Sequence, residues 1–154
     1  MNIEFIPCYS DRELFLKMAR DYVKTLHEYD NTIVWDLLTW ENAVWNAKFI
    51  LEDRTIQGFI IVEEVEYRMY NDLLYITELY IVPEARKKGA ALGAIKEAVK
   101  GWDGDIFLYI LDRNFEAKMF WTIVEEKLGW KRVERPEIRQ ERGCELRVYQ
   151  GEKE

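Results

Sequence analysis

The stretch "ITELYIVPEARKKGAALGAIKEA", residues 76–98, changes character twice within a short distance. Its opening residues favour a strand that ends at Pro83, and the alanine-rich part after Gly89 favours a helix. Between them lies a turn with three consecutive basic residues, 86–88, although the formal net charge of the chain is −7. The sequence therefore predicts a strand, a positively charged turn and a helix in immediate succession.

This turn has the features of an anion-binding site. The start of a helix presents unpaired backbone N–H groups and the positive end of the helix dipole, and a strand that turns at once into a helix directs them at one point. Gly89 lets a ligand approach the backbone closely. The residues predicted to hold a pyrophosphate here are Arg86, Lys87, Lys88, Gly89, Ala90 and Ala91. The pattern is neither a mononucleotide P-loop nor the dinucleotide fingerprint, and a solvated basic turn is the alternative.

The composition limits the classes of function. A length of 154 residues suits one domain, which we expect over residues 1–150, followed by a charged tail at 151–154. The acidic balance argues against nucleic-acid binding, which needs a broad basic face. No apolar run approaches the roughly 20 residues that span a bilayer, so we expect a cytoplasmic protein with no membrane partner. Cys8 and Cys144 are too few for a disulfide framework or a zinc site, so we expect two small buried residues and no metal.

The remaining patterns predict strands and helices in a definite order. The expected strands are residues 3–9, 48–53, 58–70, 73–83 and 105–111, with two more around a polar turn within 130–150. The expected helices are residues 10–29, 34–45, 89–101 and 114–129. Ser10 and Glu13 read as a capping box for the first helix, and Asn71-Asp72 as a turn. An antiparallel meander joined to strand–helix–strand units favours one α+β domain, with a mixed sheet and helices on both faces.

Two motifs resemble those of the GCN5-related N-acetyltransferases. "YIVPEARKKGAA" is similar to the acyl-CoA-binding motif of that family, in which a strand ends before a proline and Arg/Gln-x-x-Gly-x-Gly/Ala follows; here Arg86, Gly89 and Ala91 fill the defining positions. "NFEAKMFW…EKLGWKRV" resembles the second signature. The residues in its roles are Asn114, Ala117, Phe120, Trp121, Gly129 and Trp130. The resemblance implies an α/β/α sandwich with a mostly antiparallel seven-stranded sheet, a splayed central strand pair and about four helices.

The resemblance also implies a cofactor, acetyl-CoA, and a reaction, direct transfer of its acetyl group to a primary amine. The pantetheine arm would pair with the splayed strand like an extra strand, and the N–H near Leu79 would polarise the thioester carbonyl. The expected cofactor contacts outside the basic turn are Leu79, Tyr80, Ile81, Val82, Asn114 and Trp121. Trp121 stands where the family usually has the tyrosine that protonates the leaving thiolate. An indole N–H is a poor acid, so the general acid stays unassigned.

Glu78 is the candidate base that takes a proton from the acceptor ammonium, because it directly precedes the acetyl-binding stretch of an otherwise apolar strand. The alternative is a solvent-facing glutamate. Tyr75 and Tyr109 are weaker candidates for proton transfer, since aromatic residues in such strands are more often part of the core. His27, the sole histidine, is read as a surface residue.

The resemblance places the acceptor near the segment "NTIVWDLLTWENAVW", where aromatic rings and carboxylates suit a cationic amine. The expected acceptor contacts are Trp35, Asp36, Trp40 and Thr77. The alternative is that the tryptophans pack the helix on the sheet. The strands at 58–82 are also similar to those of the spermidine/spermine N-acetyltransferases, but Thr77 stands where those proteins tend to place an amine-binding acid.

Three functions stay open at this point. The first is acetylation of a small cationic amine, and the second is acetylation of a peptide or protein. The third is an acyl-CoA-binding or interaction module that has lost turnover, which Trp121 favours. Transfer of a longer acyl group is also open. Members of the family are often homodimers, but no pattern in the sequence identifies a pairing surface.

Overall fold

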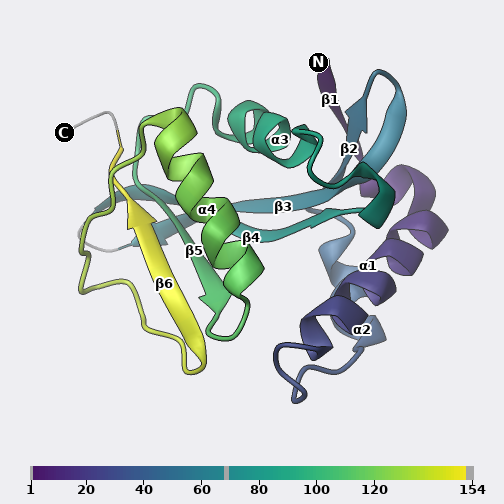
Figure 1. Ribbon diagram of the computed structural model, residues 1–154, viewed down its shortest axis with the longest axis horizontal. Coiled ribbons are helices and arrows are strands. Elements are labelled where there is room, and N and C mark those ends of the chain that lie inside the picture. Colours follow the sequence, from purple (N-terminus) through teal and green to yellow (C-terminus); the bar gives the residue numbers. More distant parts are fainter. Residues whose placement is uncertain (1, 68–69, 152–154) are drawn as a thin grey trace. The chain divides into compact units, whose positions relative to one another are not determined.

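The computed structural model describes residues 2–67 and 70–151, and these form two compact units that share two long strands (Figure 1). The first unit is Met1–Val62 with Thr77–Lys100, and the second is Glu63–Ile76 with Gly101–Glu154. The elements are β1 (Ile3–Pro7), the 3₁₀ helix η1 (Cys8–Asp11), α1 (Arg12–His27), α2 (Leu37–Ala43), β2 (Ala47–Glu52), β3 (Thr55–Tyr67), β4 (Tyr70–Ile81), the 3₁₀ helix η2 (Pro83–Ala85), α3 (Ala90–Val99), β5 (Ile106–Leu111), α4 (Phe115–Leu128) and β6 (Cys144–Tyr149). The six strands form one mixed sheet in the order β1 to β6.

In the first unit, helices cover both faces of the sheet. Strands β1, β2 and the start of β3 are antiparallel, with Phe49 opposite Phe59. One face packs on α1 and α2 through a cluster rich in aromatic rings, including Phe15, Trp40, Phe49, Phe59 and Tyr80. The other face packs on α3 through small and branched residues, including Ile50, Ile60, Ile81, Ala90 and Ala94. The expected sandwich arrangement is therefore present in this unit.

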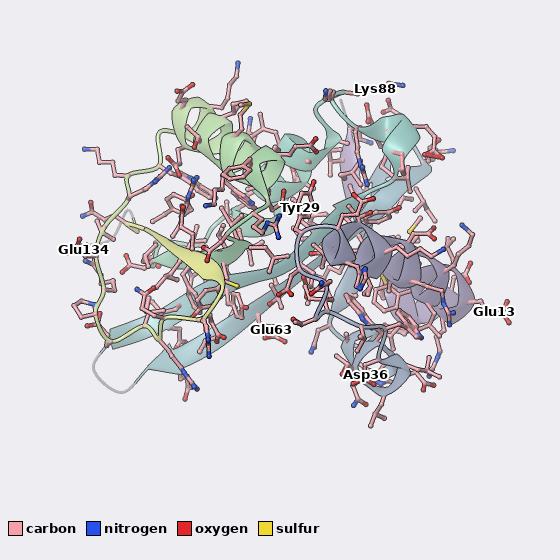
Figure 2. All side chains as sticks on the ribbon, turned by 60° about the horizontal axis from the view of Figure 1, so that its bottom comes forward. Glu13, Tyr29, Asp36, Glu63, Lys88 and Glu134 are labelled. Carbon is pink, nitrogen blue, oxygen red and sulfur yellow. The ribbon has the colours of Figure 1, made fainter. Side chains whose placement is uncertain are left out.

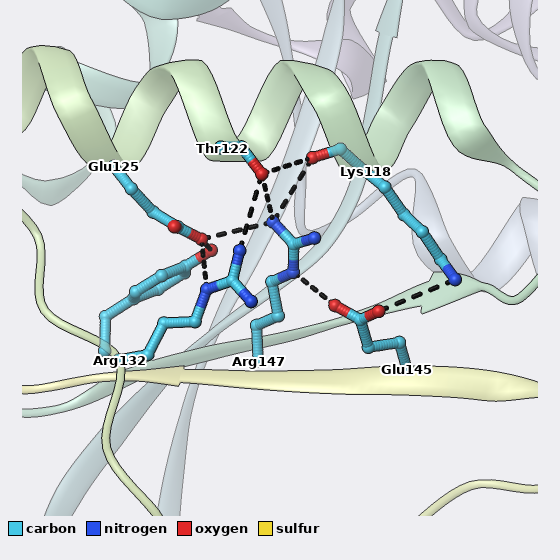
Figure 3. A network of polar contacts seen from close by, with 7 residues as sticks. Lys118, Thr122, Glu125, Arg132, Glu145 and Arg147 are labelled. Atoms are coloured by element: carbon cyan, nitrogen blue, oxygen red, sulfur yellow. Dashed lines mark hydrogen bonds and ion pairs between the residues drawn. The ribbon is translucent and has the colours of Figure 1, made fainter.

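In the second unit, β4 runs parallel to β5 and β5 runs antiparallel to β6. One face of these strands holds a cluster of Leu73, Phe107, Ile138 and Val148. The other face lies under α4, where the guanidinium of Arg147 donates to the Lys118 carbonyl of that helix (Figures 1 and 3). Trp121 and Val124 are the buried residues of α4.

The α+β class, the mixed sheet and the four α-helices are confirmed, but the count of seven strands is not. The expected strand after α4 is reduced to an isolated bridge between Arg132 and Tyr149, with Val133 N–H bonded to the Val148 carbonyl. Pro136, which has no N–H to donate, follows within a few residues. Among the described residues, no helix is both long enough and apolar enough to cross a bilayer.

Two local predictions are wrong. Asp11, not Ser10, caps α1 by accepting from the Leu14 N–H, while the Ser10 hydroxyl donates to the Pro7 carbonyl. Asn71 and Asp72 lie within β4 rather than in a turn, and residues 68–69 are outside the described residues.

Two further expectations meet the structure only in part. A single domain over residues 1–150 stays a prediction, because the chain divides into two units. Of the tail, the structure describes only Gly151, whose N–H donates to the Asp105 carboxylate. Neither cysteine forms a disulfide within the described part of the chain: Cys8 is fully buried, which raises the pKa of its thiol, whereas Cys144 is partly exposed.

Candidate active site

The basic turn has the geometry that its sequence predicts. Helix α3 begins at Ala90, and Gly89 precedes it in the left-handed conformation with φ of 89°. Lys87 also has positive φ, at 64°, which is uncommon for a residue with a side chain. The carbonyl of Gly89 accepts a backbone hydrogen bond from the Gly93 N–H, one helical turn later. Within the described part of the chain, no backbone hydrogen bond outside the regular elements uses the N–H groups of residues 87–92.

The same turn carries basic side chains. Lys88 lies at the exposed tip of the turn, as Figure 2 shows. Arg86 turns back instead: its Nε donates to the Ile81 carbonyl at 2.9 Å, and its guanidinium lies 5.7 Å from the centre of the Tyr80 ring. Arg86 therefore ties the turn to the end of β4 while keeping a positive charge at that corner. This arrangement can hold an anion such as a pyrophosphate.

The end of β4 is held very close to β3. A Cβ atom built on Gly58 would lie 1.8 Å from the Tyr80 carbonyl oxygen, so only glycine fits there. On the far side of that contact, Val82 N–H donates to the Gln57 carbonyl at 2.8 Å. The β2–β3 register shifts at the same level, between Ile50 and Leu51. The backbone of residues 79–82, which the sequence assigns to acyl binding, is thus fixed by contacts with its own unit.

Glu78 faces α1. The hydroxyl of Tyr22 donates to Glu78 Oε1 at 2.7 Å, and the pair is part-buried. The Tyr22 ring packs on Trp40, Phe59 and Tyr80. The alternative of a solvent-facing glutamate therefore does not describe this side chain. The carboxylate is directed, and it lies on the face of the sheet that α1 and α2 cover.

Sequence reasoning did not single out Tyr22. The residue falls within the predicted helix at 10–29, and a tyrosine on a buried helix face needs a partner for its hydroxyl. The need for a hydrogen-bond partner is the signal by which sequence reasoning could have selected Tyr22. It does not identify the partner, Glu78, which lies 56 residues further along the chain.

Tyr80 lies next to this pair. Burial raises the pKa of the Tyr80 phenol, and the negative charge of Asp21 adds to the increase, while Arg86 partly opposes it. The phenol is therefore neutral under ordinary conditions.

Three of the predicted acceptor contacts have structural roles in the first unit. Asp36, which is labelled in Figure 2, caps α2. It accepts from the Leu38 N–H and the Thr39 hydroxyl, and the Thr39 bond is the main cause that lowers the pKa of its carboxyl. Trp40 is buried in the aromatic cluster, as the packing alternative expected. The ring of Trp35 stacks on Trp40 with a centroid distance of 6.4 Å.

Two of these contacts fit a cationic acceptor less well than expected. The guanidinium of Arg20 lies 4.7 Å from the centre of the Trp35 ring, so a protein cation already lies over that ring. Thr77 adjoins Glu78, and successive side chains of a strand point to opposite faces, so Thr77 does not share the face of Glu78 and Trp40. Its hydroxyl is buried and has no hydrogen-bond partner among the described residues.

The remaining candidates lie in the second unit. The Asn114 side chain caps α4 by accepting from the Ala117 N–H at 3.0 Å, which leaves its amide N–H groups free of that bond. Trp121 is buried in α4. Tyr75 stacks on Phe107, and Tyr109 meets both rings edge-on. The structure describes these residues within their own unit, and their cofactor or proton-transfer roles stay predictions.

The fold of this chain is similar to that of known proteins. No family model and no curated protein matches the chain. Solved structures match it closely in shape, among them an acetyltransferase of the GNAT family from Staphylococcus aureus MU50, with a TM-score of 0.63, 13% identity and coverage of 99% of this chain and 100% of that one. The chain has the GCN5-related N-acetyltransferase fold.

Two further matches carry ligands. One is the NatC complex bound to Gag peptide and CoA, with a TM-score of 0.64, 14% identity and coverage of 97% of both chains. The other is the diaminobutyrate acetyltransferase EctA from Paenibacillus lautus in complex with L-2,4-diaminobutyric acid and coenzyme A, with a TM-score of 0.64, 9% identity and coverage of 97% and 95%. At such identities the likeness concerns the fold.

Proposed function

We propose that this protein is an acetyl-CoA-dependent N-acetyltransferase that acetylates a primary amine of a small cationic molecule. The observation that carries the proposal is the combination, in one unit, of an anion-binding turn at the start of α3 and a directed carboxylate on the strand that leads into it. Neither feature would suffice alone, because basic turns and part-buried glutamates are both common.

The residues of the turn fit the diphosphate of coenzyme A. The N–H groups before and within the first turn of α3 supply hydrogen-bond donors, the conformation of Gly89 keeps the backbone open, and Arg86 and Lys88 supply charge. The solved structures with this fold that hold coenzyme A, NatC and EctA, support the same assignment of the donor.

The chemistry assigned to Glu78 is general-base catalysis. An alkyl ammonium has a pKa near 10.4, so it must lose a proton before its nitrogen can attack. Glu78 accepts that proton, directly or through water, and the neutral amine then attacks the thioester carbonyl. A C–N bond forms, the C–S bond breaks, and the thiolate leaves. The residue that protonates the thiolate stays unassigned, because Trp121 is buried and is no acid.

Thiol release provides the direct test. The protein is incubated with acetyl-CoA and a panel that contains spermidine, 2,4-diaminobutyrate, an aminoglycoside and a peptide with a free N-terminus. We expect release with a small diamine or polyamine above the rate of hydrolysis. Release with the peptide alone would favour the protein-acetylating alternative. Binding of coenzyme A with no release for any amine would favour the non-catalytic module, and faster release from longer thioesters would reassign the acyl group.

Charge reversal tests the binding turn separately. Arg86→Glu should weaken coenzyme A binding in calorimetry by about tenfold or more, since it replaces an attractive charge with a repulsive one. Lys24→Glu, on an exposed position of α1, makes the same change of charge and should leave the affinity within about twofold. Equal losses in the two variants would mean that only net charge matters, and no binding in the wild type would remove the proposed donor.

A further inference from the structure

The bond between Tyr22 and Glu78 joins two elements that are distant in sequence. Tyr22 lies on α1 and Glu78 on β4, and the donor and acceptor oxygens are 2.7 Å apart. A free glutamate side chain has several rotamers, so a base at this position would spend much of its time pointing elsewhere. The hydroxyl selects the rotamer in which Oε1 meets α1.

The hydroxyl is itself fixed by its ring. Tyr22 meets Trp40 and Phe59 edge-on, both at interplanar angles of 88°, with centroids 6.0 Å and 5.7 Å away. Tyr80 lies against it at 5.7 Å. Because α2, β3 and β4 each contribute one of these rings, the tyrosine cannot swing without moving several buried side chains. The donor is thus in place before any substrate arrives.

Several charged or titratable groups act on this corner of the first unit. Asp21 comes from α1 and is paired with Lys17 at 3.4 Å. Tyr80 comes from β4, and its phenol senses Asp21, Arg86 and Glu84. From α2 and β3, the neighbours described around Tyr22 are the uncharged rings of Trp40 and Phe59. The charged groups described near this bond are therefore of both signs.

We propose that Tyr22 is a positioning residue for the base: its hydroxyl holds the Glu78 carboxylate ionised and aimed, and so sets the pH range in which the enzyme works. A hydrogen bond donated to a carboxylate favours the charged form. The bond is made to Oε1 of Glu78, at 2.7 Å. The inference rests on the proposed function, because it assigns Tyr22 a role in that reaction.

Tyr22→Phe tests it, since the change removes the hydroxyl and keeps the ring packing. We expect the acidic limb of the rate–pH profile to move to higher pH by roughly 0.5–1 unit, because the carboxylate loses a donor that favours ionisation. The turnover at neutral pH should fall, while the affinity for coenzyme A stays within about twofold. Tyr9→Phe is the matched control: Tyr9 is half exposed, its ring lies tilted against Trp45, and its loss of a hydroxyl should leave the profile unchanged.

A double variant and an NMR titration can each overturn the inference. In a Glu78→Gln background, Tyr22→Phe should have no further effect on the limb, whereas additive effects would overturn the inference. A shift in melting temperature with an unmoved limb would show a structural bond only. Carbon-13 NMR of the labelled Glu78 carboxyl follows its titration without turnover: an identical midpoint in wild type and Tyr22→Phe would overturn the positioning role. If the midpoint moves but no amine is acetylated, the proposed function fails instead.

Discussion

Two part-buried carboxylates, one in each unit, accept a tyrosine hydroxyl at the same distance. Glu78 of the first unit receives Tyr22 at 2.7 Å, and Glu125 of the second receives Tyr149 at 2.7 Å. The two carboxylates differ in what else surrounds them. If Glu78 is the base that we propose, a tyrosine donor alone does not decide whether a part-buried acid is structural or available for chemistry.

Around Glu125 the neighbours are cations. Arg132 donates to its carboxylate at 2.8 Å and Arg147 at 3.1 Å, and Arg147 also reaches Glu145 (Figure 3). Burial by itself would raise the pKa of Glu125, but the bonds from Arg132 and Tyr149 and the two guanidinium charges outweigh it, so the pKa lies below its usual value. A carboxylate neutralised in this way is a weak base. The bond from Tyr22 directs Glu78 without adding a positive charge.

Isosteric amides at the two positions should separate these roles most sharply. Glu78→Gln should lower turnover by about 10²–10⁴-fold, the usual contribution of a general base, with little change in coenzyme A affinity. Glu125→Gln should leave turnover nearly intact and lower the free energy of unfolding, because it strands buried donors. Thiol release and urea unfolding of both variants provide the measurements. Full activity in Glu78→Gln would remove Glu78 from the mechanism.

Truncation of the buried arginine should give the largest loss of stability. The side chain of Arg147 is only 6% exposed, so Arg147→Ala leaves Glu125 and Glu145 without their central cation. We expect a cost of about 3–5 kcal/mol in the free energy of unfolding. Arg132→Ala is the control, because it contacts the same Glu125 from a side chain that is 47% exposed. It should cost about 0–1 kcal/mol, and similar losses in the two variants would contradict the structural role of Arg147.

The sequence predicted the parts of this comparison that depend on local signals. Pro83 ends a strand and Gly89 allows the left-handed turn before a helix, and both effects act within a few residues. The basic turn and the start of α3 were therefore readable from the sequence. Glu78 could be selected because a carboxylate in an apolar strand needs a reason.

The features that depend on contacts between distant residues could not be predicted from the sequence. The partner of Glu78 lies 56 residues away, and no local pattern connects it with Tyr22. Arg147 lies between Leu146 and Val148 in the last strand, and a charged residue between apolar ones usually faces solvent. In the structure, however, α4 covers it. Asp36 differs from these two residues, because its helix cap is a local role made with Leu38 and Thr39, and its contact with the acceptor stays a prediction.

The close contact between Gly58 of β3 and the Tyr80 carbonyl of β4 allows a test of how rigidly Glu78 must be held. In Gly58→Ala the new methyl group would meet the Tyr80 carbonyl at 1.8 Å, so β4 must shift. We expect a loss of about 1–3 kcal/mol in stability and a larger proportional loss of turnover than of coenzyme A affinity. Gly101→Ala is the control, because its Cβ would meet no atom within 4 Å and its φ of 81° costs only about 1 kcal/mol. Turnover that falls equally in both variants would argue against a requirement for β4 at this position.

The smallest expected effect is the response of the second unit to acid. Burial would raise the pKa of Glu145 as it would that of Glu125, but the bond and charge of Arg147 lower it, so both folded carboxyls hold protons more weakly than in the unfolded chain. Their contribution is therefore complete above the unfolded pKa of about 4.3 and is lost as the pH falls through the lower folded values. Urea unfolding at several pH values between 6 and 3 should show this loss, on the order of 1 kcal/mol after solvent screening.

Because other carboxyls titrate in the same range, the informative quantity is the difference from Arg147→Met, which keeps a long apolar side chain but removes the cation. The variant should lose less stability than the wild type as the pH falls, and parallel curves would mean that the arginine does not set the affinity of these carboxylates for protons.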